Sequence, residues 1–137
     1  MDPMMFDASP FPALIAWSVV LLFIHIGLQS VIATRELGST WNAGPRDDEK
    51  KPKGKFAGRA ERASLNFRET YPAFIALALV QMFTGDPTDW GFYGGLVWFL
   101  CRIVYVPLYL FGIPYIRSLV WLGSVAGLVI MAFHLIF

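Results

Sequence analysis

In the segment GRAERASLNFRETYP, residues 58–72, charged side chains stand immediately before an apolar run. The segment holds three arginines and two glutamates, and residues 73–83 that follow it read AFIALALVQMF. Charged side chains are costly in the hydrocarbon of a membrane, and those that occur there usually serve a site. The segment therefore predicts a helix that enters a membrane and directs a polar face toward something other than lipid.

The composition places the chain among membrane proteins. It has 137 residues, of which 56% are hydrophobic and 15% are charged, and a soluble domain of this size could not bury so much apolar surface. A net charge of +1, with no basic tail and no glycine-rich phosphate loop, argues against a nucleic-acid partner. The single cysteine, Cys101, excludes a disulfide within the chain.

Four apolar segments predict an all-α fold, an integral membrane four-helix bundle in one domain over residues 1–137. About 20 apolar residues cross the hydrocarbon as a helix. The first segment follows a stretch without Lys or Arg and is too long for the apolar part of a signal peptide, so we expect a retained anchor. A polar loop rich in Gly and Pro should occupy residues 35–58. The predicted helices span residues 12–34, 59–83, 90–111 and 116–137.

The basic residues predict the orientation, because short loops rich in Lys and Arg stay on the cytoplasmic side. Nine of the eleven lie between Arg35 and Arg68, and Arg117 falls in a turn on the same side of the bilayer. The segments on the opposite side, the N-terminus and residues 84–89, carry acids and no basic residue. We expect a multi-pass protein with both termini on the non-cytoplasmic side, in the inner membrane if the source is bacterial.

Polar residues of the second predicted helix lie on one stripe. Arg59, Arg62, Asn66 and Glu69 follow the helical period. Arg59 is interpreted as part of a solvated collar at the headgroups. Glu69 should lie about 8 Å inside the cytoplasmic boundary and Arg102 of the third helix about 13 Å inside it, within reach of each other if the helices are neighbours. The two side chains could form a buried ion pair that fixes the helix register, or part of a binding site.

Further polar residues should converge at this depth. Tyr105 and Tyr109 follow Arg102 on the same helix face, and Arg117 and Ser118 begin the last helix at that level. Arginine binds carboxylates with two hydrogen bonds, amides donate and accept, and a glutamate can accept a ligand ammonium. These residue types beside an apolar bundle predict a pocket for a small anionic polar ligand next to a lipophilic one, and a dipeptide- or tripeptide-like thiol would use all three groups.

Three segments resemble the MAPEG superfamily, the membrane-associated proteins of eicosanoid and glutathione metabolism. They read RAERASLNFRETYPAF (59–74), CRIVYVPLYL (101–110) and PYIRSLVW (114–121). The motif Arg-x-x-x-Asn-x-x-Glu appears as Arg62, Asn66 and Glu69, and the resemblance spans nearly the whole chain. It implies a homotrimer that binds glutathione between neighbouring subunits on the cytoplasmic side.

The resemblance also implies roles for individual residues. Arg117 and Ser118 resemble an Arg-Ser pair beside the thiol, where the arginine stabilises the thiolate. The chain departs from the family pattern at Leu65, where the prostaglandin synthase subgroup has an arginine, and at Tyr105 and Trp121, which replace a histidine and a tyrosine. The residues that the resemblance implies for the glutathione site are Arg62, Asn66, Glu69, Arg102, Tyr105, Tyr109 and, from a looser match in the first loop, Arg35.

Three functions are compatible with these features. The first is a glutathione-dependent transferase or peroxidase that acts on a lipophilic electrophile. The second is a non-catalytic membrane protein that binds lipids or a lipophilic ligand, which Leu65 and Trp121 favour. The third is a small transporter or channel, since His25 and His134 are titratable residues inside predicted membrane helices.

Overall fold

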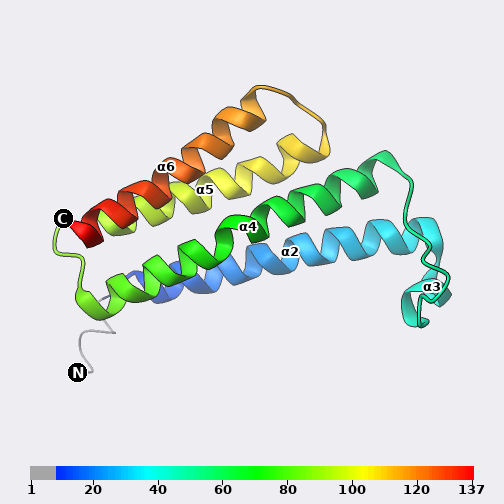
Figure 1. The fold of residues 1–137 in the computed structure, drawn as a ribbon, viewed down its shortest axis with the longest axis horizontal. Coiled ribbons are helices and arrows are strands. Elements are labelled where there is room, and N and C mark those ends of the chain that lie inside the picture. Colours follow the sequence, from blue (N-terminus) through cyan, green and yellow to red (C-terminus); the bar gives the residue numbers. More distant parts are fainter. Residues whose placement is uncertain (1–8) are drawn as a thin grey trace.

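The computed structural model describes residues 9–137, and over this range the chain is helical, with no strand. The long helices lie side by side, and α2 begins at the same end of the molecule where α6 ends (Figure 1). The short helix α3 and the turn between α5 and α6 lie at the other end (Figure 1). Residues 1–8, part of the segment used to predict the orientation, fall outside the described residues. The helices are α2 (Phe11–Leu37), α3 (Ser39–Ala43), α4 (Lys55–Thr84), α5 (Trp90–Leu110) and α6 (Ile116–Ile136).

The connection between the first two long helices is shorter than the expected loop over residues 35–58. Helix α2 continues to Leu37, α3 occupies part of the connection, and α4 already begins at Lys55. The carboxylate of Glu36 accepts hydrogen bonds from the backbone N–H groups of Lys53 and Gly54. The first N–H groups of a helix lack partners within it. Glu36 therefore ties the end of α2 to the start of α4.

Substituting Glu36 by alanine should loosen this connection without unfolding the bundle. Loss of the carboxylate leaves the N–H groups of Lys53 and Gly54 to water, so we expect their amide hydrogen exchange to become about tenfold faster. Asp47→Ala, a loop carboxylate that makes no hydrogen bond to these amides, is the matched control and should leave both exchange rates unchanged. Equal acceleration in the two variants would show that general loop charge, not the Glu36 contact, orders the segment.

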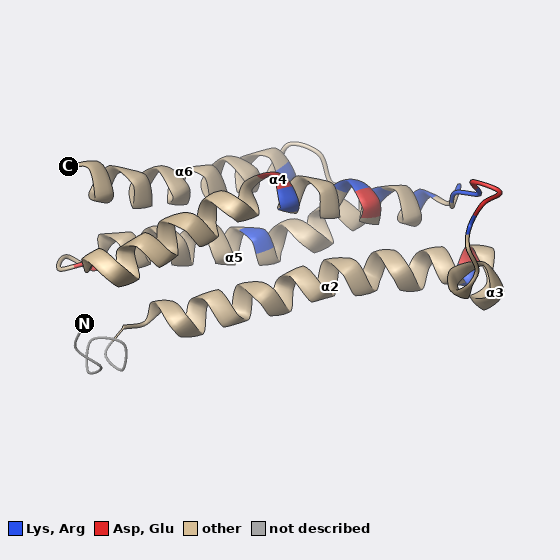
Figure 2. Ribbon diagram, turned by 60° about the horizontal axis from the view of Figure 1, so that its bottom comes forward, with Lys and Arg blue, Asp and Glu red and all other residues tan. Residues whose placement is uncertain are grey.

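Within residues 9–137, three helices are long and apolar enough to cross a membrane, judged by length and composition: α2, α5 and α6. Helix α4 does not meet this criterion, because its N-terminal half is charged. Its remaining residues, 70–84, carry no charge. Lys and Arg gather mainly in the loop beside α3 and in the adjoining half of α4, with single blue turns farther along α5 and α6 (Figure 2). The charged residues of α4 are Lys55, Arg59, Glu61, Arg62, Arg68 and Glu69.

Aromatic rings fill the centre of the bundle. Phe67 and Phe74 of α4 and Trp98 of α5 are fully buried. The rings of Phe74 and Trp98 stack with centroids 4.1 Å apart and an interplanar angle of 8°. Phe67 continues the cluster toward Trp98 at 5.7 Å. Because Phe67 and Phe74 are seven residues apart in α4, they share one face of that helix, and their packing against Trp98 turns this face inward.

Two buried polar contacts link helices that are distant in sequence. Ser18 of α2 shares a hydrogen bond of 3.0 Å with the hydroxyl of Tyr71 in α4. The Gln81 amide of α4 donates to the Met131 carbonyl of α6 over 3.3 Å. In an apolar bundle such bonds favour one arrangement of the helices, because sliding a helix would leave the polar groups without partners.

Helices α5 and α6 approach so closely that their backbones touch. A Cβ atom added to Gly94 would lie 2.7 Å from the Gly127 carbonyl oxygen, and one added to Gly127 would lie 2.8 Å from the Trp98 backbone nitrogen. Neither distance leaves room for a side chain. Small residues are the usual means by which membrane helices come this close.

Candidate functional site

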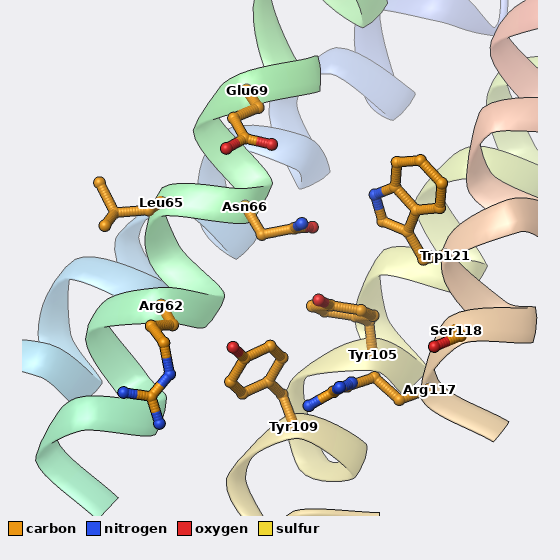
Figure 3. A pocket seen from close by; sticks show the side chains of 9 residues that line it. All are labelled: Arg62, Leu65, Asn66, Glu69, Tyr105, Tyr109, Arg117, Ser118 and Trp121. Atoms are coloured by element: carbon orange, nitrogen blue, oxygen red, sulfur yellow. The ribbon is translucent and has the colours of Figure 1, made fainter. Parts of the chain in front are cut away.

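A cavity of about 420 Å³ opens between α4, α5 and α6, on the side of the bundle away from α2. Its volume lies within the range of about 300–1,000 Å³ that is usual for small-molecule sites. The structure thus brings together every site residue proposed from the sequence except Arg35 and Arg102 (Figure 3). The lining residues are Arg62, Leu65, Asn66, Glu69, Tyr105, Tyr109, Arg117, Ser118 and Trp121.

Helix α4 supplies one wall of the cavity. Arg62, Leu65, Asn66 and Glu69 are spaced by three, four and seven residues, so they share one helix face. The Asn66 amide points across the cavity toward α6, and the Glu69 carboxylate lies one turn away from it (Figure 3). Arg62 and Glu69 are exposed, whereas Asn66 is half-buried. The wall therefore carries a cation, an amide and a carboxylate in sequence along its length.

Arg102 lies behind the cavity and is fully buried. Its Nη1 donates to the Oδ1 of Asn66 over 2.7 Å. The ion pair with Glu69 that the sequence suggested is absent: no carboxylate of the described residues lies within 4 Å of the guanidinium. The helix register places Asn66 opposite Arg102, and a neutral amide accepts the bond without the desolvation of a second charge. With its oxygen occupied, Asn66 has its NH₂ group left to donate to a ligand.

Two tyrosine rings lie between two guanidinium groups. The Arg102 guanidinium sits 4.4 Å from the ring centroid of Tyr105, and the Arg117 guanidinium 4.6 Å from that of Tyr109. The two rings are 5.5 Å apart. A cation over an aromatic face is stabilised by the charge distribution of the ring. The rings thus hold both arginines in place without neutralising their charge.

Arg117 is the cation best placed to act on a ligand. It is half-buried, it lines the cavity, and no carboxylate of the described residues pairs with it. Arg117 and Ser118 lie in the first turn of α6, where unsatisfied backbone N–H groups favour negative charge. An anionic group in the cavity would meet both the side-chain charge and this helix end.

The turn that precedes Arg117 is held by a residue whose role the sequence did not reveal. Arg59 donates from Nη1 to the Leu110 carbonyl over 3.0 Å, at the end of α5. Its guanidinium also fills the space beside Gly112, where an added Cβ would lie 2.6 Å from Nη2. Arg59 therefore joins α4 to the turn between α5 and α6 and is not simply a solvated residue. No local pattern marks this contact, because the carbonyl that it binds is 51 residues away.

Arg35 does not reach the cavity. It is exposed in the last turn of α2. Helix α2 packs against α4 and α5, whereas the cavity lies between α4, α5 and α6. The resemblance implies a site between neighbouring subunits, so the place of Arg35 in a single chain does not test its part in that site.

Leu65 and Trp121, two of the positions where the sequence departs from the family pattern, line the cavity. Leu65 is 48% exposed and adds an apolar patch to the α4 wall. The Nε1 atom of Trp121 is buried and has no hydrogen-bond partner among the described residues. Figure 3 shows the indole facing α4 across the cavity. An unpaired buried donor is costly, so an acceptor on a bound molecule would be favourable there.

The two histidines lie among different aromatic neighbours. His25 of α2 is buried, with its ring 4.8 Å from that of Phe67. His134, in the last turn of α6, stacks on Trp90 at 6.1 Å. Neither residue lines the cavity. Their contacts are those of packed aromatic rings.

Comparison with known proteins supports the resemblance seen in the sequence. The family profile described as MAPEG family matches residues 14–137. No curated protein and no solved structure was found to match the chain. The profile match covers all the long helices except the first three residues of α2, and it includes every residue that lines the cavity. The chain therefore belongs to the MAPEG family, membrane proteins of glutathione and eicosanoid metabolism.

Proposed function

We propose that this protein is a glutathione-dependent transferase or peroxidase that acts on lipophilic electrophiles taken from the membrane. The observation that supports this most directly is the Arg117 guanidinium. It faces a cavity that also contains amide, hydroxyl and carboxylate groups, and no carboxylate of the described residues neutralises it. Family membership makes glutathione the thiol to test first.

The cavity residues match the groups of glutathione. The tripeptide carries two carboxylates, an ammonium group, two amide bonds and a thiol. Arg62 and Arg117 supply positive charge for carboxylate and thiolate, and Glu69 can accept from the ammonium. The Asn66 amide and the unpaired Trp121 N–H can serve the peptide groups.

The proposed chemistry needs the thiol in its ionised form. A free thiol has a pKa of about 8.5 and is mostly protonated at neutral pH. Arg117 would favour the thiolate by its charge, and Ser118 would donate a hydrogen bond to it. In conjugation of an aryl chloride, a carbon–sulfur bond forms, the carbon–chlorine bond breaks, chloride leaves and the thiol proton passes to solvent.

The assembly and the membrane orientation belong to the same proposal. We infer that α4 crosses the membrane with its charged half near the cytoplasmic surface, that the protein is a homotrimer, and that both termini lie on the non-cytoplasmic side. The exposure of Arg62 and Glu69 in a single chain supports a cavity completed by a neighbouring subunit. Arg35, which lies apart from the cavity of its own chain, would then be available to that of another subunit.

The proposal is tested with purified protein in detergent. We expect glutathione binding in calorimetry and saturable conjugation of 1-chloro-2,4-dinitrobenzene, followed by absorbance. A glutathione analogue with serine in place of cysteine should bind and inhibit but not react, which separates recognition of the peptide from thiol chemistry. Binding of neither tripeptide would refute the proposal.

A second function is favoured by the apolar side of the cavity. Leu65 and Trp121, at positions where the resemblance implies polar side chains, line the site, which suits a membrane protein that binds a lipid or lipophilic ligand without catalysis. In that case calorimetry with glutathione would show no heat, and a lipid would copurify with the protein.

Introducing a cation at Leu65 should strengthen glutathione binding. Leu65→Arg places a guanidinium on the α4 wall, where it can meet a ligand carboxylate, and we expect Kd to fall about fivefold because the position is half-exposed and screened. Leu65→Gln is the matched control, since it adds a polar group without charge and should change Kd by less than twofold. Calorimetry at two salt concentrations measures both, and a gain that survives high salt would contradict the electrostatic explanation.

A further inference from the structure

A second cavity, of about 330 Å³, lies at the end of the bundle that carries α3. It shares no lining residue with the cavity between α4, α5 and α6 and is separate from it. The last turns of α2 form one wall, and α3, the following loop and Glu61 of α4 form the others. The lining residues are Ile26, Gln29, Ser30, Ala33, Trp41, Asn42, Arg46, Lys50, Lys51, Pro52 and Glu61.

Three of the four charged residues that line this cavity are cationic, and the acids Asp47, Asp48 and Glu49 of the same loop do not line it. Arg46, Lys50 and Lys51 face one acid, Glu61. Lys50 also pairs with Asp48 at 3.7 Å, but the two side chains are 67% and 53% exposed. An exposed pair of this kind contributes little and gives way to a better-placed anion. The cavity therefore offers an excess of positive charge to a ligand.

The fold holds one of these cations in a defined position. The Arg46 guanidinium stacks on Trp41 at 4.3 Å and donates from Nη2 to Oδ1 of Asn42 over 2.6 Å. Only Nη2 is used in these bonds, so Nη1 and Nε can donate to a ligand. The Nε1 atom of Trp41 is buried and lacks a partner among the described residues. An anionic acceptor could thus receive hydrogen bonds from the free N–H groups of Arg46 and from Nε1 of Trp41.

The position of the cavity along α2 matches the membrane interface. Gln29 and Ala33 lie 18 and 22 residues after Phe11, about 27 and 33 Å along the helix. With Phe11 taken as the opposite hydrocarbon boundary, a hydrocarbon layer about 30 Å thick ends between Gln29 and Ala33, where the headgroups begin. Ile26, one turn before Gln29, is 49% exposed and lines the cavity on its apolar side. A ligand there would touch lipid chains at one end and basic side chains at the other.

From these observations we infer that the α3 cavity binds the headgroup of an anionic phospholipid. The phosphate would accept hydrogen bonds from Arg46 and Trp41 and meet the charge of Lys50 and Lys51, while an acyl chain lies along Ile26. A soluble phosphate ester offers the same anion, but it would make no use of the apolar wall. This inference concerns the membrane interface and does not depend on glutathione chemistry.

Native mass spectrometry of the detergent-solubilised protein tests the inference, with phosphatidylglycerol and phosphatidylcholine as probes. We expect the first phosphatidylglycerol to bind at least tenfold more tightly than phosphatidylcholine. Lys50→Gln with Lys51→Gln should weaken phosphatidylglycerol binding about 25-fold, because each lysine near an anionic lipid contributes roughly fivefold. Lys53→Gln with Lys55→Gln removes the same charge from the same region outside the cavity and should change the affinity by less than threefold.

Three results would overturn the inference. Equal affinity for the two lipids would mean that the cavity does not recognise net charge. Equal weakening in the two double variants would mean that the lipid responds to diffuse loop charge and not to a site. Displacement of phosphatidylglycerol by millimolar glycerol 3-phosphate would assign the site to a soluble phosphate ester. Retained binding in the presence of that competitor supports the lipid.

Discussion

Arg117→Ala is expected to lower kcat/KM for aryl chloride conjugation at pH 7 by up to about 30-fold, because only about 3% of a thiol with a pKa of about 8.5 is ionised at that pH. Without this cation the thiol of bound glutathione keeps a pKa near its free value of about 8.5, so less thiolate is present at neutral pH. The loss should fall mainly on kcat, because the peptide contacts proposed for Arg62, Asn66 and Glu69, which line the cavity, stay in place. Steady-state kinetics at pH 7 measures the effect.

The pH dependence distinguishes a role in ionisation from a structural role. As the pH rises through about 8.5, the thiol ionises without assistance, so the activity of Arg117→Ala should recover toward that of the native protein. A variant that is merely misfolded would not recover. Arg68→Ala is the matched control: it removes an exposed arginine that does not line the cavity and should retain the native rate. Native kinetics in Arg117→Ala would exclude the proposed role.

Gly127→Ala is expected to destabilise the bundle by about 3 kcal/mol, at the upper end of overpacking effects. The new methyl group would meet the Trp98 backbone nitrogen at 2.8 Å, and backbone atoms cannot rotate away as a side chain can. Helices α5 and α6 would have to separate, which would also widen the cavity that both of them line. Thermal unfolding in detergent should show an apparent Tm lower by about 10 °C or more.

Gly27→Ala provides the comparison for this experiment. Gly27 lies within α2, and a Cβ added there would meet nothing within 4 Å. Alanine has the higher helix propensity, so this variant should be neutral or slightly more stable. An equal change of stability in the two variants would show that the close contact at Gly127 contributes nothing specific, contrary to the packing described above.

Hydropathy and helical spacing were sufficient to predict much of the architecture from the sequence. The apolar segments predicted an all-helical membrane protein, and the described helices and the family match confirm this class. The motif of Arg62, Asn66 and Glu69 predicted the family, which the profile match confirms. Helix spacing also placed these three side chains on one face, and the structure shows them along one wall of a cavity. Such features depend on residues within a few turns of one another, so they can be inferred locally.

Contacts between helices could not be inferred in this way. The sequence suggested Glu69 as the partner of Arg102, whereas the structure pairs Arg102 with Asn66 and leaves Glu69 exposed. Arg59 looked like a solvated residue but holds the end of α5, and Arg35, which the resemblance implied for a site between subunits, lies away from the cavity of its own chain. Each outcome depends on the rotation and offset of one helix against another. A shift of one turn exchanges one partner for the next, and that shift is set by the packing of rings such as Phe74 and Trp98 and by the close contact at Gly127.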